Sequence, residues 1–320
     1  MFSYIRKRII HMVPLLLGIT FFSFLIIQMA PGDYFDQLKL NPQISKITLE
    51  KMRQEFGLDR PWIVQYFNWL KNILKLDFGY SFTYHVPVFD LIKERAWNTF
   101  SLSFLSIVFI WLLAIPMGVV SAVKKEKIPD KLFSIIAFLG MSIPNFFIAF
   151  LLIFAAAKTG WLPIGGVVSI DHETLSIPGR IADYLKHIII PISVLVIGGL
   201  AGLMRLMRAN MLEVLRSQYI ITARAKGLPE YLVIYKHALR NAINPLVTIF
   251  GYEISGLLSG AALIETVTSW PGLGRLMLDA VFSQDLYLVM GSLLMSAVLL
   301  LVGNLIADIL LLIVDPRIRQ

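Results

Sequence analysis

Long apolar runs constrain this chain more than any other feature. Six stretches of about 18 residues or more are mostly apolar, the length that an α-helix needs to cross the hydrocarbon core of a bilayer. They are Ile9–Ala30, Thr99–Val123, Leu132–Ala157, Ile188–Met204, Leu246–Val267 and Leu288–Val314. Hydrophobic residues occupy 57% of the 320 positions, which is more apolar surface than one soluble core can bury. We therefore predict an all-α integral membrane protein with six transmembrane helices.

The first run follows the basic residues Arg6, Lys7 and Arg8, as the apolar part of a signal peptide would. It is longer than such a region and no small-residue cleavage site follows it. We expect it to remain in the protein as the first span.

The basic residues predict the orientation of these spans. Sixteen of the 29 Lys and Arg lie before the first run, in residues 124–131, in residues 205–245 or in the tail after the last run. Of the other thirteen, nine lie in the long segment 31–97, where eight acids balance them. Because short cytoplasmic loops are enriched in Lys and Arg, both termini and residues 205–245 are predicted to be cytoplasmic. The protein is then a multi-pass component of the cell membrane.

The outer segment 31–97 is predicted to be helical. Thr48 can cap a helix that Gly57 ends, and a second helix can start at Pro61. Its apolar face would hold Trp62, Tyr66, Trp69, Leu70 and Ile73. Whether these helices contact substrate or form only a packing lid stays open. No repeat or linker divides the chain, so we predict one membrane domain, 1–320, with an extracytoplasmic loop at 31–97.

Catalytic and nucleotide motifs are absent from the sequence. It has no P-loop, no H-E-x-x-H pair and no G-x-S-x-G elbow, and its five His are scattered. It also has no cysteine. The basic residues behind the net charge of +8 are concentrated on one predicted side of the membrane. This distribution explains the charge without a nucleic-acid partner. We therefore expect no enzymatic activity, no metal site and no cofactor held by this chain.

Two acidic residues, Glu253 and Asp308, lie well within the predicted spans. Glu253 either faces a water-filled path or pairs with a neighbouring helix, and Asp308 either pairs structurally or serves transport. We name Glu253, Ser255 and Ser259 as candidates for a translocation path. The small residues around Gly198 and the Met204, Met207 and Met211 stripe are expected to be packing surfaces.

The cytoplasmic segment 205–245, here called the coupling segment, carries seven Lys and Arg against two Glu. Ala223 and Gly227 are four residues apart, so on a helix they would form one small-residue face for a cleft in a partner. Arg224 and Lys226 would point elsewhere and fix the docking by charge. The alternative is a solvated loop that only sets the topology.

Several motifs in order resemble one transporter family. They are Met29–Asp33, Gly57–Pro61, Asp77–Ser81, Ser142–Asn145, Thr222–Gly227, His237–Ala242 with Pro245, Glu265 with Ser269–Arg275, and Asp308 with Asp315–Arg317. Together they cover nearly the whole chain and resemble the oligopeptide and dipeptide permease family, the membrane subunits of ABC importers. Two departures concern the coupling segment. Ile221 and Thr222 stand where the wider importer motif has Glu-Ala, and Pro245 follows later than in that motif.

The resemblance implies a permease that forms half of a translocation path for oligopeptides or dipeptides. Its implied partners are a second homologous permease subunit, two ABC ATPase subunits that use ATP and Mg²⁺, an extracytoplasmic substrate-binding protein and the lipid bilayer. It assigns ATPase coupling to Tyr219, Thr222, Ala223, Arg224, Ala225, Lys226, Gly227, Leu228, Pro229 and Glu230. Members of this class that carry oligosaccharides or nickel chelates remain alternatives. A second alternative is an ion-coupled transporter that uses Glu253 and Asp308. A third is a receptor or scaffold whose outer loop binds a partner.

Overall fold

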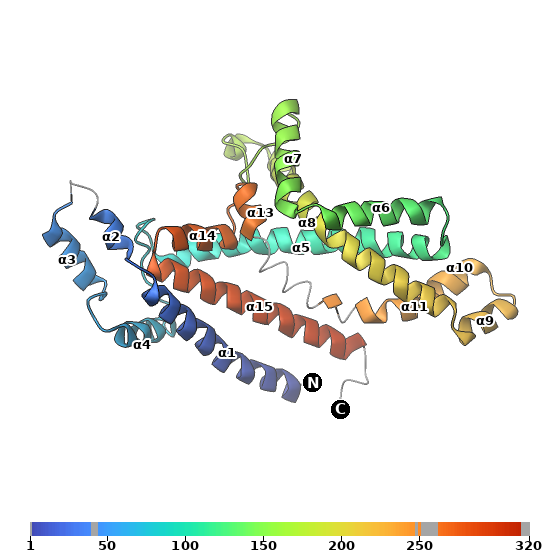
Figure 1. The fold of residues 1–320 in the computed structure, drawn as a ribbon, viewed down its shortest axis with the longest axis horizontal. Coiled ribbons are helices and arrows are strands. Elements are labelled where there is room, and N and C mark those ends of the chain that lie inside the picture. Colours follow the sequence, from blue (N-terminus) through green and yellow to red (C-terminus); the bar gives the residue numbers. More distant parts are fainter. Residues whose placement is uncertain (1, 40–43, 247–248, 251–261, 315–320) are drawn as a thin grey trace. The chain divides into compact units, whose positions relative to one another are not determined.

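The computed structural model describes residues 2–39, 44–246, 249–250 and 262–314, and its regular elements are all helices (Figure 1). Within these ranges, extended backbone pairs at an isolated bridge between Tyr80 and Pro87. The predicted all-α class is thus confirmed. The chain forms two compact units. One consists of Phe2–Thr99 with Pro271–Leu301, and the other of Phe100–Trp270 with the chain from Val302 onward.

Among the residues that the structure describes, four helices are each long and apolar enough to cross a membrane. They are α1 (Phe2–Met29), α5 (Val88–Val123), α8 (Ile177–Leu215) and α15 (Leu286–Val314). They contain the first, second, fourth and sixth predicted runs, except that the first run ends one residue beyond α1. Most of the fifth run lies outside the described residues, and its end forms α13 (Ala262–Val267). The total of six spans therefore stays a prediction.

The third run, Leu132–Ala157, is not one continuous helix, so the expected continuity was wrong. Its two helices are together long and apolar enough for a broken span, and the membrane crossing stays a prediction. The run is divided between α6 (Ile128–Ser142) and α7 (Asn145–Thr159), which are bent by 100° relative to each other. Pro144 causes the break, because proline lacks an amide hydrogen and disfavours helical backbone at the residue before it. Ile143 is accordingly extended, with ψ 125°. Each helix has 15 residues, or about 22 Å, and is shorter than the hydrocarbon core.

In the unit Phe100–Trp270, α8 is the central helix and contacts both α6 and α7. Its Met204, Met207 and Met211 side chains are fully buried, as expected of a packing stripe. A Cβ on Gly198 would lie 2.5 Å from Asn145 Oδ1, so this glycine lets α7 approach α8 closely. The small and methionine residues of this helix therefore serve packing, as predicted.

In the unit Phe2–Thr99 with Pro271–Leu301, the outer segment folds into short helices. These are α2 (Tyr34–Leu38), α3 (Lys46–Glu55) and α4 (Trp62–Ile73), and α14 (Leu273–Phe282) belongs to the same unit. Ser45, not Thr48, caps α3, since its hydroxyl accepts the Thr48 amide at 3.1 Å. Gly57 follows the end of α3 in the left-handed region, with φ 69°.

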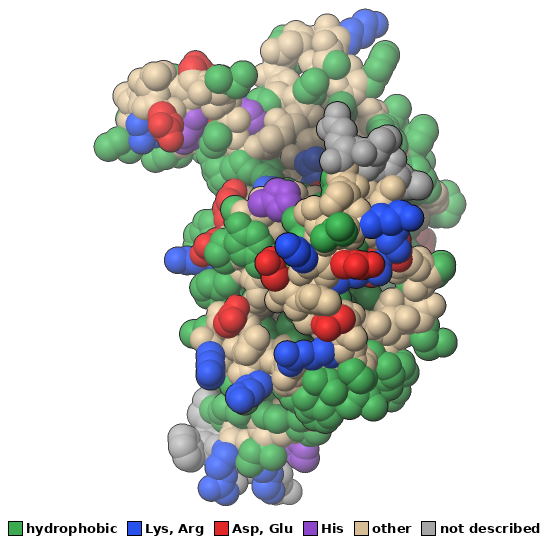
Figure 2. All heavy atoms as spheres, turned by 90° about the vertical axis from the view of Figure 1, so that its left-hand side faces the viewer, with side chains coloured by type: hydrophobic (Ala, Val, Ile, Leu, Met, Phe, Trp, Pro, Cys, Tyr) green, Lys and Arg blue, Asp and Glu red, His purple; other side chains and the backbone are tan. Residues whose placement is uncertain are grey.

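Helix α4 starts at Trp62, directly after Pro61, and buries Tyr66 and Trp69 as its apolar spacing predicts. The Tyr66 hydroxyl lies 3.1 Å from that of Thr20 in α1, which ties this part of the outer segment to the first long helix. Earlier in the segment, the Phe56 carbonyl accepts a hydrogen bond from the Tyr287 hydroxyl of α15 at 2.7 Å. Figure 2 shows acidic and basic side chains interspersed over the face to which these helices belong, which fits the balanced charge of the segment.

Candidate functional site

Helix α8 carries the predicted fourth span directly into the coupling segment. It has 39 residues and a length of about 58 Å, so Arg205–Leu215 continue the span without a break. The sequence alone had placed a boundary at Met204. The structure instead joins the membrane part and the start of the coupling segment in one rigid element.

A buried ion pair fixes this part of α8 to the base of α6. Arg208 Nε donates to Asp130 Oδ1 at 2.7 Å, and Arg208 Nη2 donates to Asp130 Oδ2 at 2.8 Å. Asp130, which is only 4% exposed, also accepts the Ser121 hydroxyl and the Glu126 amide. Such a two-pronged, charge-assisted contact is geometrically specific. It links the end of α5, the turn after it, α6 and α8.

The helix α9 (Gln218–Ala225) begins after the chain turns at Ser217, whose hydroxyl donates to the Val214 carbonyl at 2.6 Å. Its inner face packs into the core that contains Met207 and Met211. Ile220 is fully buried there and Ala223 is 8% exposed. The predicted small-residue face is therefore divided, because Ala223 faces the chain's own core and Gly227 lies at the surface.

The end of α9 is a glycine-dependent cap. The Gly227 amide donates to the Arg224 carbonyl at 2.9 Å, and the Leu228 amide donates to the Ala223 carbonyl at 3.4 Å. This is the Schellman pattern, and it requires the left-handed backbone seen at Gly227, with φ 75°. A Cβ at this position would meet no atom within 4 Å. Glycine is thus needed for the backbone conformation and not for space within the chain.

An ion pair closes the turn from outside. Arg224 Nη2 lies 2.6 Å from Glu230 Oε1, and Arg224 Nε donates to Glu230 Oε2 at 3.2 Å. The hydrogen bond from Arg224 lowers the pKa of Glu230 below its ordinary value. Both side chains are more than a third exposed, so solvent screening limits the pair to roughly 1 kcal/mol or less. Arg224 therefore has a partner within the turn and is not held in reserve for docking.

After the turn, the chain packs back onto the same core. Helix α10 (Glu230–Leu232) leads into the π-helix η2 (Val233–Ala238) and then α11 (Leu239–Ala242). Val233 and Ala238 are fully buried, and η2 contacts both α8 and α9. A π-helix is rare and often marks a functional position. In Figure 1, α9 and α10 lie beyond one end of α8.

The outer surface of this region combines aromatic, apolar and basic side chains. The exposed side chains include Tyr219, Ile221, Arg224, Lys226, Leu228, Tyr231, Tyr235, Lys236 and Arg240. Aromatic residues and Arg are enriched in protein interfaces. Tyr231 and Tyr235 were not among the predicted coupling residues, although two tyrosines in a basic segment between apolar runs are a signal for a contact surface.

The three candidates for the translocation path, Glu253, Ser255 and Ser259, lie outside the described residues. Asp308 is described and is half-buried in α15. The structure therefore brings together the predicted coupling residues 219–230, and the predicted path stays a prediction.

These features define a multi-pass membrane protein with a glycine-capped turn after its long helix α8 and no nucleotide motif of its own. Residues 114–320 match the family of the binding-protein-dependent transport system inner membrane component, and residues 1–103 match the N-terminal part of such membrane components. The chain belongs to this family. It is a permease subunit in the inner membrane and not an enzyme, and its family implies ATPase subunits and a substrate-binding protein as partners.

Relatives match along the entire chain. An oligopeptide transport system permease protein, AppB of Bacillus subtilis, is 43% identical, and the match covers 100% of this chain and 100% of that relative. A putative peptide permease of Brucella ovis is 36% identical, with 100% of this chain and 99% of the relative covered. The dipeptide transport system permease protein DppB of Escherichia coli shows 36% identity with the same coverage.

A solved structure shares the fold. It is an inward-facing conformation of the MetNI methionine ABC transporter, with a TM-score of 0.53 and 20% identity. The match covers 70% of this chain and 96% of that chain. At this identity the likeness concerns the fold alone.

Proposed function

We propose that this chain forms half of the translocation path of an ABC importer for oligopeptides or dipeptides. A second homologous permease supplies the other half. Two ATPase subunits use ATP and Mg²⁺, and an extracytoplasmic binding protein delivers the cargo, so the chain holds no cofactor. The observation that carries the proposal is the 43% identity, over the complete chain, to an oligopeptide permease.

The proposed topology has six spans, with both termini and the coupling segment 205–245 in the cytoplasm and the segment 31–97 outside. The distribution of Lys and Arg supports it. The absence of cysteine makes a direct test available, since single cysteines at Lys51 and Lys226 can be labelled with a membrane-impermeant thiol reagent. Both positions are exposed. Labelling from outside at Lys51 and only after permeabilisation at Lys226 is expected, and the reverse pattern would overturn the topology.

The proposed coupling contact is the outer surface of residues 219–230. Tyr219, Thr222, Ala225, Lys226, Leu228 and Pro229 are exposed there. In this proposal Ala223 positions α9 on the core, and Arg224 with Glu230 holds the turn. The ATPase would then move a preformed surface that is packed against α8.

Reconstitution with and without ATPase subunits distinguishes this importer from an ion-coupled transporter. Uptake of a labelled peptide that requires ATP, the ATPases and the binding protein is expected. Uptake driven by an ion gradient with this chain alone would favour a role for Glu253 and Asp308 instead. Competition by oligosaccharides or a nickel chelate, but not by peptides, would correct the cargo without changing the class.

The variant Gly227→Arg tests the coupling contact, and Gly160→Arg is its control. Gly160 has φ 69° and, as at Gly227, a Cβ added there would have no atom within 4 Å, so both changes impose similar backbone strain. We expect ATP-driven uptake to be lost in Gly227→Arg and retained in Gly160→Arg, with equal membrane insertion. Normal uptake in Gly227→Arg would refute the contact.

A further inference from the structure

A cavity of about 690 Å³ lies within the unit Phe2–Thr99 with Pro271–Leu301. Its volume is in the range of about 300–1,000 Å³ that is usual for small-molecule sites. The walls come from the end of α1, from α2 and α3, and from α14 with the start of α15. Residues 205–245 of the coupling segment, all of which are described, contribute none of the residues that line it. Its role therefore needs a separate explanation.

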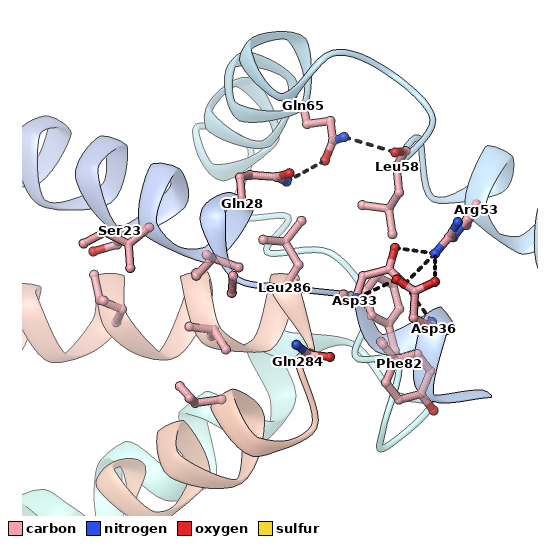
Figure 3. A pocket seen from close by; sticks show the side chains of 18 of the residues that line it. Ser23, Gln28, Asp33, Asp36, Arg53, Leu58, Gln65, Phe82, Gln284 and Leu286 are labelled. Carbon is pink, nitrogen blue, oxygen red and sulfur yellow. Dashed lines mark hydrogen bonds and ion pairs between the residues drawn. The ribbon is translucent and has the colours of Figure 1, made fainter. Parts of the chain in front are cut away.

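One end of this cavity is charged (Figure 3). Arg53 Nη2 donates to both carboxylate oxygens of Asp33 at 2.7 Å and to Asp36 Oδ1 at 2.8 Å. A single nitrogen thus makes all three bonds. Arg53 Nε is buried and, within the described part of the chain, has no hydrogen-bond partner. Lys39 Nζ also donates to Asp36 Oδ1 at 2.6 Å, and the Arg53 side chain is 28% exposed. This end thus places a partly exposed guanidinium beside two carboxylates, an arrangement that suits a ligand with both charges.

The other end of the cavity is mainly aliphatic. Ile26 and Ile27 of α1 face Val289 and Leu293 of α15 there, beside Ser23. Helix α1 is an open wall, since only 11% of its most apolar window is buried inside the protein. An aliphatic ligand at this end of the cavity would therefore take the place of lipid chains beside α1. It would not have to enter an enclosed protein core.

Amide side chains occupy the zone between the two ends. Gln28 Nε2 lies 3.3 Å from Gln65 Oε1, and Gln284 Nε2 donates to the Pro31 carbonyl at 3.0 Å. The lining thus changes from aliphatic through amide to charged, as the bilayer does from its hydrocarbon to its headgroups. In the proposed topology the end of α1 and the start of α15 lie at the outer surface of the membrane. The graded polarity matches this depth.

We propose that this cavity binds a phospholipid of the outer leaflet with a zwitterionic, ethanolamine-type headgroup. The phosphate lies against the exposed part of the Arg53 guanidinium, the ammonium group lies against Asp33 and Asp36, and one acyl chain lies between α1 and α15 along Ile27 and Leu293. The site rests on the proposed topology. It would anchor the outer segment to the bilayer surface while the rest of the permease moves.

The test uses the assembled transporter in vesicles that contain phosphatidylethanolamine with a photoreactive group in its acyl chain. After irradiation, mass spectrometry locates the labelled peptides. Arg53→Gln removes the phosphate donor, and Lys51→Gln is the control, because Lys51 is exposed on the same helix and does not line the cavity. Leu293→Trp fills the aliphatic end. Its control is Phe22→Trp at an exposed position of α1 outside the cavity.

We expect label in residues 23–30 and 286–293, reduced about tenfold by Arg53→Gln and by Leu293→Trp and unchanged by both controls. Because Leu293→Trp keeps the charged cluster, it remains informative if Arg53→Gln fails to fold. Label that is spread along α1 and insensitive to the variants would overturn the site. Equal labelling by a phosphatidylglycerol probe would overturn it as well. So would label on the second permease in place of the residues that line the cavity. Peptide uptake is measured in the same vesicles. Normal ATP-driven uptake without specific label rejects the lipid site alone, whereas failed uptake in the wild type rejects the proposed function.

Discussion

The ion pair between Asp130 and Arg208 allows a quantitative prediction. Arg208→Met removes both bonds and leaves the Asp130 carboxylate, which is 4% exposed, with only the Ser121 hydroxyl and the Glu126 amide. Breaking a buried pair in this way costs about 3–5 kcal/mol. Asp130→Asn should cost less, about 1–3 kcal/mol, because the Arg208 side chain is 28% exposed and its charge can reach water.

The double variant gives the decisive comparison. In Asp130→Asn with Arg208→Met no charge is buried, so we expect it to be more stable than Arg208→Met alone, by about 1–3 kcal/mol. The free energy of unfolding is measured in mixed detergent micelles by intrinsic tryptophan fluorescence. Arg205→Met is the control for loss of a cation from the same helix, since Arg205 is exposed, and it should change stability by about 0.5 kcal/mol or less.

Additive losses in the double variant would refute this reasoning, since they would mean that the two side chains do not interact energetically. A loss in Arg208→Met no larger than in the Arg205 control would refute it as well. A second measurement concerns transport. If the pair makes α6 and α8 move together, Arg208→Met should lower ATP-driven uptake more than its folded fraction explains.

Three further changes test separate features. Gly227→Ala should destabilise the turn by about 1 kcal/mol through its positive φ and lower ATP-driven uptake, whereas Gly227→Asn, which tolerates this backbone, should lose less of both. The Arg224 bond lowers the pKa of Glu230 below its ordinary 4.5, so its stabilisation is present above that value and disappears as the pH falls through the lowered pKa. Glu230→Gln should accordingly be less stable than the wild type by up to about 1 kcal/mol near neutral pH and equal to it in acid, as measured by unfolding at a series of pH values. Gly198→Ala should destabilise the helix packing, because its Cβ would lie 2.5 Å from a neighbouring side chain, while Gly202→Ala, with no atom within 4 Å, should not; the midpoints of thermal unfolding in detergent compare them.

The long helices could be predicted because bilayer thickness imposes a minimum apolar length, which hydropathy reads directly. The same method failed at Leu132–Ala157. Hydropathy is continuous there, and the break depends on the backbone chemistry of Pro144. The proline was visible in the sequence. The 100° bend between α6 and α7 could not be predicted from that proline, because prolines also occur inside helices that continue, such as Pro116 in α5.

The coupling segment shows the same limit for side chains. The cap at Gly227 was not predicted, because Gly227 was placed with Ala223 on one helix face, although a glycine after a basic helix end is the local signal for such a cap. Spacing placed Ala223 on one side of α9, but it could not tell whether that side meets a partner or the chain's own core. The pair Asp130 with Arg208 joins residues 78 positions apart, and no local pattern links them.

The packing of the turn explains how a contact at its surface could reach the membrane. Ile220 of α9 and Val233 of η2 lie in the same buried cluster as Met207 of α8. A force on the outer surface of residues 219–230 therefore acts on a packed core, and packed cores shift as bodies because they resist deformation. Arg208 then connects α8 to α6 through Asp130. If the ATPase pushes this turn, the first elements to move should be α8 and α6 together, and the Asp130 pair is the place where that joint motion can be broken without touching the turn.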